Sequence, residues 1–460
     1  MYAIELNDRA LALADDGEVL ACEPSIVFEG SGAEPAGTPA HAYLKLRPGA
    51  VSSTHLCVLL NPGADAVRAA SLLASDVSRR LAAHPVPAGA AIWIATSTAL
   101  PPYALGVLLG AIEALGLRVG GFVDAAVVSA AALGLDRPAI ALDLGLHHLA
   151  ASALECGGEI RLGRTLSSTR GGLLELHQAW LALIATMLVK RTRFDVLHEA
   201  VSEQQLFDEI PRLAREAAAD GSATALISHE GDRFEVPIAR DQFVQAAEPI
   251  YRELLRVLHA LRPAGAPVTL MLPRAAAELP GLREACGEFE GCEIVTLADG
   301  FAAVATSVSE LPEPAAPVQL LRRLAAQRCG RCESLAVREL LTRTSHAVRE
   351  ATHVIYAGKA YPLGAQPVLV GRAASDGRAI VLPEGTAGIS RRHCSFVREG
   401  SETVLVDHSR FGTLVNGERV AERARVRAGD RVRLGEPGLE LTLIDMREAA
   451  SQTHVAPPAD

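Results

Sequence analysis

The sequence contains very little lysine and few aromatic residues. Among its 460 residues only Lys45, Lys190 and Lys359 are lysines, so arginine supplies almost all of the positive charge. Aromatic residues make up 4% of the chain, whereas hydrophobic residues make up 49%, much of it alanine. This composition is typical of a folded globular protein and lacks the low hydrophobicity and high charge of a disordered chain. The three lysines also limit where a catalytic lysine can lie.

The chain has no excess of positive charge and no long hydrophobic run. Its formal net charge of −10 argues against broad binding to nucleic acids or membrane surfaces. The most apolar run, AWLALIATMLV at 179–189, is too short to cross a bilayer and is expected to be a buried helix. The N-terminus has no charged leader before an apolar core, and eight scattered cysteines do not suggest a disulfide framework. We therefore expect no nucleic-acid partner, no membrane insertion and a cytoplasmic location.

A proline-rich stretch, LPEPAAPVQ at 311–319, divides the chain into two parts. Before it, three strand-like segments are followed by a helix-like segment and further alternation, which predicts an α/β architecture with mixed sheets. From Val354 onward, short strand-like segments separated by Gly, Asp or Asn predict a β-sandwich. We expect a first domain at 1–310, a linker with a short helix at 311–350, a second domain at 351–447, and a disordered tail at 448–460.

Several short motifs follow one another in the C-terminal part. They are Gly371-Arg372, Ser390-Arg391-Arg392-His393, Asp407-x-Ser409, Gly412-Thr413 and Asn416-Gly417. An arginine fork and a serine hydroxyl suit a phosphate group, which offers three strong acceptor oxygens. An Asn-Gly pair suits a tight hairpin turn, because both residues tolerate positive φ. The motifs therefore predict a phosphate-binding site on a β-sandwich.

This set of motifs resembles the forkhead-associated (FHA) domain, a β-sandwich family that binds phosphothreonine peptides. The resemblance implies an all-β FHA sandwich whose partner is a phosphothreonine-containing protein, such as a substrate of a Ser/Thr kinase. It assigns the phosphate contacts to Arg372 and Ser390, with Arg391 nearby, and makes His393 a buried brace for the Ser390 loop. The other motif positions are implied to be structural: Gly371, Asp407, Ser409, Gly412, Thr413, Asn416 and Gly417.

Arg410 and Phe411 depart from the FHA pattern, because many members have Thr-Asn at these two positions. Arg410 can add a contact to the phosphate or the peptide. Phe411 cannot form the side-chain hydrogen bonds that asparagine makes to the peptide backbone. We expect both residues at the peptide site, with an altered affinity or selectivity. The alternative is a sandwich that docks to its partner without a phosphate.

The order of segments in the first 300 residues resembles the ATPase domain of DnaK-type heat-shock chaperones, within the actin superfamily. AIELNDR takes the place of the first phosphate loop, and ALDLGLHHLAASALE takes the place of the second. GFVDAAVVSAAALG and LADGFAAVATS resemble two further family segments, the latter the closing helix. The resemblance implies an actin-like ATPase fold built from ribonuclease H-type repeats.

The residues implied to bind the nucleotide are mostly replaced. The glycine and two threonines of the first loop are Asn7, Asp8 and Arg9, whose side chains obstruct the close approach of a phosphate. The second loop keeps Asp143 and Gly145, but the next two glycines are replaced by Leu and His and the following threonine by a second His.

Three further family positions are changed. The catalytic glutamate falls at Ala125, the lysine at His41, and a flexible glycine of the adenosine loop at Pro273. An arginine- or histidine-assisted phosphate site using Arg9 and His147 is a weaker alternative to a retained scaffold with solvated loop residues.

We therefore expect no catalytic residue and no cofactor, although Glu5 and Asp143 could still hold Mg²⁺-bound water in an Mg-ATP site. The positions predicted to be vestigial nucleotide contacts are Glu5, Asn7, Asp8, Arg9, Asp143 and Gly145. No metal site is expected. His147 and His148 are adjacent and point apart on a strand, and the Cys329-x-x-Cys332 pair lacks two further ligands.

The predicted function is a phosphothreonine-binding adaptor or scaffold in Ser/Thr kinase signalling, with a catalytically inactive chaperone-like domain. One alternative is a nucleotide-dependent DnaK-like chaperone that its FHA domain recruits to clients. Another is a structural assembly factor in which neither ligand binds.

Overall fold

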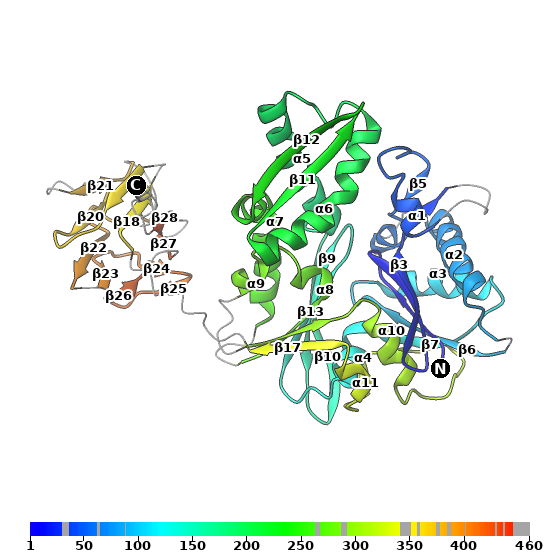
Figure 1. The fold of residues 1–460 in the computed structure, drawn as a ribbon. Coiled ribbons are helices and arrows are strands. Elements are labelled where there is room, and N and C mark those ends of the chain that lie inside the picture. The colour runs from blue at the N-terminus through cyan, green and yellow to red at the C-terminus, as the bar shows by residue number, and fades with distance from the viewer. Residues whose placement is uncertain are drawn as a thin grey trace, which may run out of the picture. The chain divides into compact units, whose positions relative to one another are not determined.

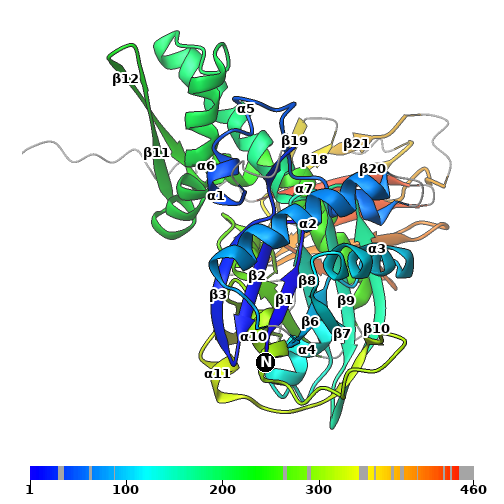
Figure 2. The ribbon, with the colours of Figure 1, turned by 90° about the vertical axis from the view of Figure 1, so that its right-hand side faces the viewer.

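The protein forms two compact units in the computed structural model, Met1–Arg343 and Thr344–Asp460. Figure 1 shows the elements of both, and Figure 2 shows them turned by 90°. The structure describes these residues: 1–29, 36–61, 65–87, 89–262, 267–286, 292–340, 351–356, 359–373, 378–383, 388–400, 402–427, 430–435 and 438–444.

The first sheet of unit 1 is mixed, with the strand order β15-β7-β6-β1-β2-β3. Its five main strands are β1 (Ala3–Leu6), β2 (Ala10–Asp15), β3 (Glu18–Pro24), β6 (Ala91–Thr96) and β7 (Arg118–Asp124). The first three are antiparallel, and β6 and β7 run parallel to β1. The turn between β2 and β3 has positive φ at Asp16 and Gly17, where the DDG sequence predicted a turn. The helices α2 (Ala66–Ala83) and α3 (Pro102–Glu113) pack on this sheet through the core around Leu73 and Leu108.

The second sheet repeats the same arrangement, with the order β16-β10-β9-β8-β13-β14-β17. Its main strands are β8 (Ala139–Leu144), β9 (Leu149–Glu155), β10 (Glu159–Ser168), β13 (Thr269–Pro273) and β14 (Glu293–Leu297). Again the first three are antiparallel, and the last two run parallel to the first. The predicted α/β architecture with mixed sheets is confirmed, and its membership of the actin superfamily stays a prediction.

Two short helices share one core with strands of both sheets. They are α4 (Ala125–Ala132) and α10 (Phe301–Val308), and both are almost wholly buried. Their side chains pack with Val123 of the first sheet and with Ala141 and Val295 of the second. The helix α10 also contacts β1, whose end carries the first of the two expected phosphate loops.

A helical lobe extends from the second sheet and is coloured green in Figure 1. It contains α5 (Leu173–Thr192), α6 (Ala200–Asp220), α7 (Arg240–Leu261) and the hairpin of β11 (Ser222–His229) and β12 (Asp232–Ala239). By length and composition α5 could span a membrane. However, Trp180 and Ile184 are fully buried in the core, and the Trp180 indole donates to the Phe243 carbonyl at 2.9 Å. The prediction that this apolar run is a buried helix is confirmed.

The segment 311–350 was predicted to be a linker with a short helix. Between residues 320 and 340 it instead adds strands to the sheets of unit 1. It forms β15 (Leu320–Leu321), β16 (Arg323–Ala325), α11 (Gly330–Glu333) and β17 (Ala336–Leu340). β15 pairs with β7 of the first sheet, whereas β16 and β17 pair with β10 and β14 at opposite edges of the second. Exposed sheet edges offer unpaired N–H and C=O groups, and these short strands satisfy them. The leucine spacing that suggested a helix therefore belongs mainly to edge strands.

The remaining short elements of unit 1 lie between the larger ones. They are β4 (Val27–Phe28), α1 (Thr38–His41), β5 (Val51–Ser52), the 3-10 turn η1 (Cys57–Leu60), α8 (Arg274–Ala277) and α9 (Leu282–Ala285). The end of the expected linker, 341–350, and the expected tail, 448–460, lie outside the described residues.

Unit 2 is a β-sandwich, as predicted. One sheet has the order β19-β18-β28-β27-β24-β25, and the other has the order β21-β20-β22-β23-β26. Phe396 and Leu405 of one sheet pack with Val432 and Leu441 of the other in a single core. The strands are β18 (His353–Tyr356), β19 (Lys359–Pro362), β20 (Val368–Gly371), β21 (Ala379–Val381), β22 (Cys394–Glu399), β23 (Glu402–Asp407), β24 (Thr413–Val415), β25 (Glu418–Arg419), β26 (Arg423–Val426), β27 (Arg431–Leu434) and β28 (Leu439–Ile444).

Candidate functional site

Three loops of unit 2 meet at Ser390. The Arg372 amide, just after β20, donates to the Ser390 carbonyl at 3.3 Å, and the Ala373 amide donates to the Arg391 carbonyl at 3.0 Å. From the loop between β23 and β24, the Arg410 amide donates to Ser390 Oγ at 3.1 Å. The structure therefore brings together Arg372, Ser390, Arg391 and Arg410, which lie far apart in the sequence.

His393 fixes the Ser390 loop from inside. Its Nδ1 accepts from the Ser390 amide at 3.1 Å, and its Nε2 lies 3.2 Å from the Gly412 carbonyl. Burial lowers the pKa of His393, so the ring is neutral, with its proton on Nε2 and donated to Gly412. Because the Ser390 amide is used in this way, the group that Ser390 can offer a phosphate is its hydroxyl proton.

Asp407 organises the next loop. Its Oδ1 accepts from the Ser409 amide and from Thr413 Oγ1, both at 2.9 Å, and Ser409 Oγ accepts from the Gly412 amide at 2.7 Å. Burial alone raises the pKa of Asp407, but the hydrogen bonds from Ser409 and Thr413 outweigh it and hold the pKa below its usual value. The aspartate thus stays ionised and shapes the loop that presents Arg410.

Two glycines are required by close approach at this site. A Cβ at Gly371 would lie 2.1 Å from the Arg391 carbonyl oxygen, so only glycine lets the two loops touch. Gly412 has φ of +89°, and a Cβ there would lie 2.9 Å from two nitrogens of Arg419. Farther along, Asn416 and Gly417 have φ of 51° and 90° and form the hairpin turn expected from their sequence.

Arg372 has an unused donor at the centre of this loop cluster. Its side chain is half-buried, and its Nε is buried without a hydrogen-bond partner in the described part of the chain. A buried donor without a partner costs free energy, and a phosphate oxygen would satisfy it. Arg391 and Arg410 are exposed beside it, and Phe411 is 55% exposed. The arrangement can bind a dianion with one arginine fork and one hydroxyl.

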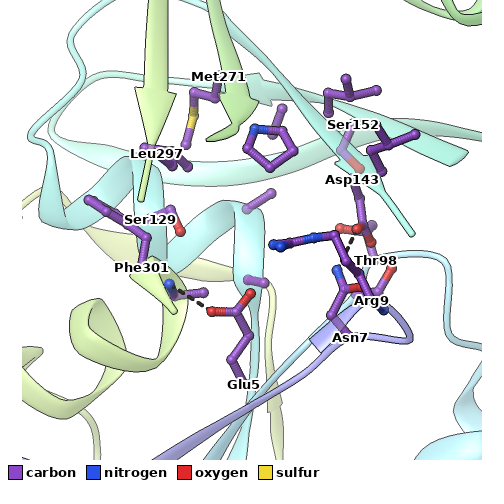
Figure 3. A pocket seen from close by; sticks show the side chains of 18 of the residues that line it. Glu5, Asn7, Arg9, Thr98, Ser129, Asp143, Ser152, Met271, Leu297 and Phe301 are labelled. Carbon is purple, nitrogen blue, oxygen red and sulfur yellow. Dashed lines mark hydrogen bonds between the residues drawn. The ribbon is translucent and has the colours of Figure 1, made fainter. Parts of the chain in front are cut away.

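The expected nucleotide cleft of unit 1 has a different character. A cavity of about 80 Å³ lies between the two sheets and is lined by residues from both (Figure 3). Across it, Asn7 Nδ2 donates to Asp143 Oδ1 at 2.7 Å. Glu5 accepts from the amides of Ala302 and Ala303 at the start of α10, at 3.1 and 3.3 Å, and burial raises its pKa. Glu5 and the Oδ1 atom of Asp143 are therefore tied to protein groups of the cleft itself, whereas Oδ2 of Asp143 has no hydrogen-bond partner among the described residues.

Asp8 occupies the backbone amides of the second loop. Its Oδ1 accepts from the Leu146 amide at 2.9 Å, and its Oδ2 accepts from the His147 amide at 3.0 Å. Its Oδ2 also lies 3.2 Å from His148 Nδ1. A Cβ at Gly145 would lie 2.0 Å from Asp8 Oδ1, so this approach depends on the retained glycine. An internal carboxylate thus takes the amides that an anion would otherwise bind.

The hydrogen bonds and opposite charges of this contact outweigh the burial of its two side chains. Burial opposes ionisation of Asp8, but the hydrogen bond and charge of His148, together with the two amides, lower its pKa overall. For His148, burial acts to lower the pKa, but the Asp8 hydrogen bond and the charge of Asp143 raise it above its ordinary value. Asp8 and His148 are 2% and 4% exposed. The expectation of solvated loop residues was therefore wrong, because the replaced side chains bind one another in the interior.

Arg9 crosses the cleft. Its Nη1 lies 2.7 Å from Asp299 Oδ1, in the segment between β14 and α10. Arg9 lines the 80 Å³ cavity and also a second, mainly apolar cavity of about 370 Å³. Figure 3 shows its side chain extending into the space beside Asp143. His147 lines neither of these cavities, and its Nε2 lies 3.0 Å from Ser53 Oγ.

The other altered positions also have structural partners. Beside Ala125, the Asp124 carboxylate accepts from the Ala126 and Val127 amides and so caps α4. His41 Nδ1 lies 3.2 Å from Asp208 Oδ1. No group of three or more His, Cys, Asp or Glu side chains in the described ranges is arranged to hold a metal ion.

Sequence comparison agrees with the C-terminal site. The family model of the FHA domain matches residues 368–435, a range that begins with β20 and ends just after β27. It includes the loops that carry Arg372, Ser390 and Arg410. No curated protein sequence matches the chain. The predicted FHA domain is confirmed over this range, and its general ligand in that family is a phosphothreonine-containing protein. The C-terminal part of this chain therefore carries an FHA domain.

Proposed function

We propose that this protein is an adaptor that binds a phosphothreonine-containing partner through its FHA domain. The observation that carries the proposal is the buried Nε of Arg372, which has no partner among the described residues, on a loop whose backbone is bonded to Ser390. A phosphothreonine supplies close to two negative charges and three acceptors, which match this pair of donors. A substrate of a Ser/Thr kinase in the cytoplasm is the partner that this proposal implies.

We further propose that unit 1 is an inactive actin-like domain that acts as a scaffold. The repeated strand order of its two sheets supports the actin-like fold. The Asp8 carboxylate on the Leu146 and His147 amides supports the loss of nucleotide binding. The central cavity of about 80 Å³ is also smaller than ordinary small-molecule sites, which measure roughly 300–1,000 Å³.

Peptide binding by the full chain tests the adaptor. We expect a fluorescent phosphothreonine peptide library to bind, and Arg372→Ala to abolish binding. Arg423→Ala is the matched control, because Arg423 pairs with Glu399 on the sheet and lies outside the Ser390 loops. Equal binding of the unphosphorylated library, or unchanged binding by Arg372→Ala, would refute phosphate recognition.

The rival function is a nucleotide-dependent chaperone, and the 370 Å³ cavity beside Arg9 is the observation that favours it. Titration calorimetry of the full chain with millimolar Mg-ATP separates the two. We expect no heat of binding. Saturable binding of Mg-ATP would replace the scaffold proposal with the chaperone.

A further inference from the structure

We infer that the partner carries acidic residues beside its phosphothreonine, and that Arg391, Arg410 and Arg419 recognise them. The inference rests on the proposed phosphothreonine binding and adds a class of partner, an acidic phosphopeptide. We call these three residues the rim arginines.

The rim arginines surround the Ser390 site. Arg391 follows Ser390 directly and receives the Ala373 amide on its carbonyl. Arg410 is attached to Ser390 Oγ through its own amide. Arg419 comes from β25, and its guanidinium lies against Gly412, within 3 Å of the point where a Cβ would stand. Gly412 in turn is held by His393, so all three arginines are anchored to the phosphate loops.

The rim arginines have no acidic partner among the residues that the structure describes, whereas two arginines of β26 do. Arg423 pairs with Glu399 and Arg425 with Glu402. The carboxylate of Asp407, just before the loop that carries Arg410, is already used by Ser409 and Thr413. The positive charge at the rim is therefore left for a ligand.

Charge is distributed unevenly between the two parts of the chain. Residues 351–447 contain 14 Lys and Arg against 11 Asp and Glu, whereas residues 1–350 contain 30 against 41. The FHA part is thus net positive in a chain whose net charge is −10. A net positive charge favours acidic ligands and raises their association rate at low salt.

Phe411 explains why charge would dominate recognition. It is exposed between Arg410 and Gly412, and its ring has no hydrogen-bonding group for a peptide backbone. With backbone contacts weakened at this position, the flanking side chains of the peptide carry more of the selectivity. Each exposed ion pair increases affinity only modestly, so three together give about tenfold.

The test compares three phosphothreonine peptides that differ only in their flanks: Asp and Glu, Ser and Gln, or Lys and Arg. Fluorescence anisotropy with the full chain measures each affinity at 50 and 300 mM salt. We expect the acidic peptide to bind about tenfold more tightly than the neutral one at low salt, and the ratio to shrink at high salt. The unphosphorylated acidic peptide should bind weakly or not at all.

Variants test whether the rim arginines cause the preference for the acidic peptide. Arg419→Gln and Arg410→Gln should each lower the acidic-to-neutral affinity ratio about twofold; Arg410→Gln keeps the amide bonded to Ser390. Arg423→Gln removes the same charge from the sheet and should leave the ratio unchanged. An equal loss in Arg423→Gln, or a wild-type ratio near one, would overturn the inference while leaving phosphothreonine binding intact. Failure of all three phosphopeptides to bind would instead overturn the proposed function, and the inference with it.

Discussion

The carboxylate of Asp8 lies 3.0 Å from the backbone nitrogen of His147, so an acidic side chain after β1 binds an amide after β8. The two residues belong to hairpins of different sheets, and their contact links the halves of unit 1. The side chain of Asp8 was expected to obstruct the approach of a phosphate. In the structure its carboxylate is itself the anion that the loop amides bind.

Removing Asp8 should therefore destabilise unit 1. Asp8→Ala leaves the Leu146 and His147 amides and His148 without their acceptor, which we expect to cost about 2–4 kcal/mol in the free energy of unfolding. Urea denaturation followed by circular dichroism measures this. Asp232→Ala, at the exposed start of β12, is the control and should change stability by less than about 0.5 kcal/mol. Equal stabilities of the two variants would contradict the role of Asp8.

His177 should make stability depend on pH. Burial against Trp180 and Phe207 lowers the pKa of His177 to about 4, so the unfolded chain takes up the proton first as the pH falls. The stability contributed by the neutral ring is present above pH 6.5 and is lost between pH 6.5 and 4. Relative to His177→Phe, the wild type should lose about 1–2 kcal/mol between pH 7 and 5. Denaturation curves that give the same stability difference between the wild type and His177→Phe at pH 7 and pH 5 would rule this out.

A methyl group at residue 371 should disable the FHA loops. In Gly371→Ala the new Cβ would lie 2.1 Å from the Arg391 carbonyl oxygen, so the Ser390 loop must move. We expect affinity for a phosphothreonine peptide to fall at least about tenfold, measured by anisotropy. Gly364→Ala is the control, because the nearest atom there is an Arg378 nitrogen at 3.7 Å. Wild-type affinity of Gly371→Ala would contradict this loop geometry.

Cutting the chain at residue 310 should expose three sheet edges. The fragment 1–343 keeps β15, β16 and β17, whereas 1–310 loses them and also the buried Cys332 of α11. We expect 1–310 to melt several degrees lower and to aggregate, because open edges pair with other chains. Calorimetry and light scattering compare the two fragments. Identical melting would show that the segment is a linker after all.

The FHA loops were predictable because phosphate binding requires particular side chains at fixed turns. The mixed sheets could be predicted because three strand-like segments precede a helix-like segment in the sequence. The edge strands at 320–340 could not be predicted from the sequence, because the spacing of their leucines and charges fits a helix equally well. These residues form strands because they pair with open edges of the two sheets, which the sequence does not show.

Contacts between segments that lie far apart in the sequence could not be predicted either. The amides that bind Asp8 lie 138 and 139 residues away along the chain. Arg419 gave no motif signal, because its place beside Gly412 depends on the hairpin register that pairs it with Leu414. The Asn416-Gly417 turn is the local signal from which that register could have been inferred.

The edge strand β17 also determines when the second sheet can be completed. It is the last strand of that sheet in chain order, and it closes the edge formed by β14. During synthesis this edge therefore stays open until the chain has been made as far as Leu340.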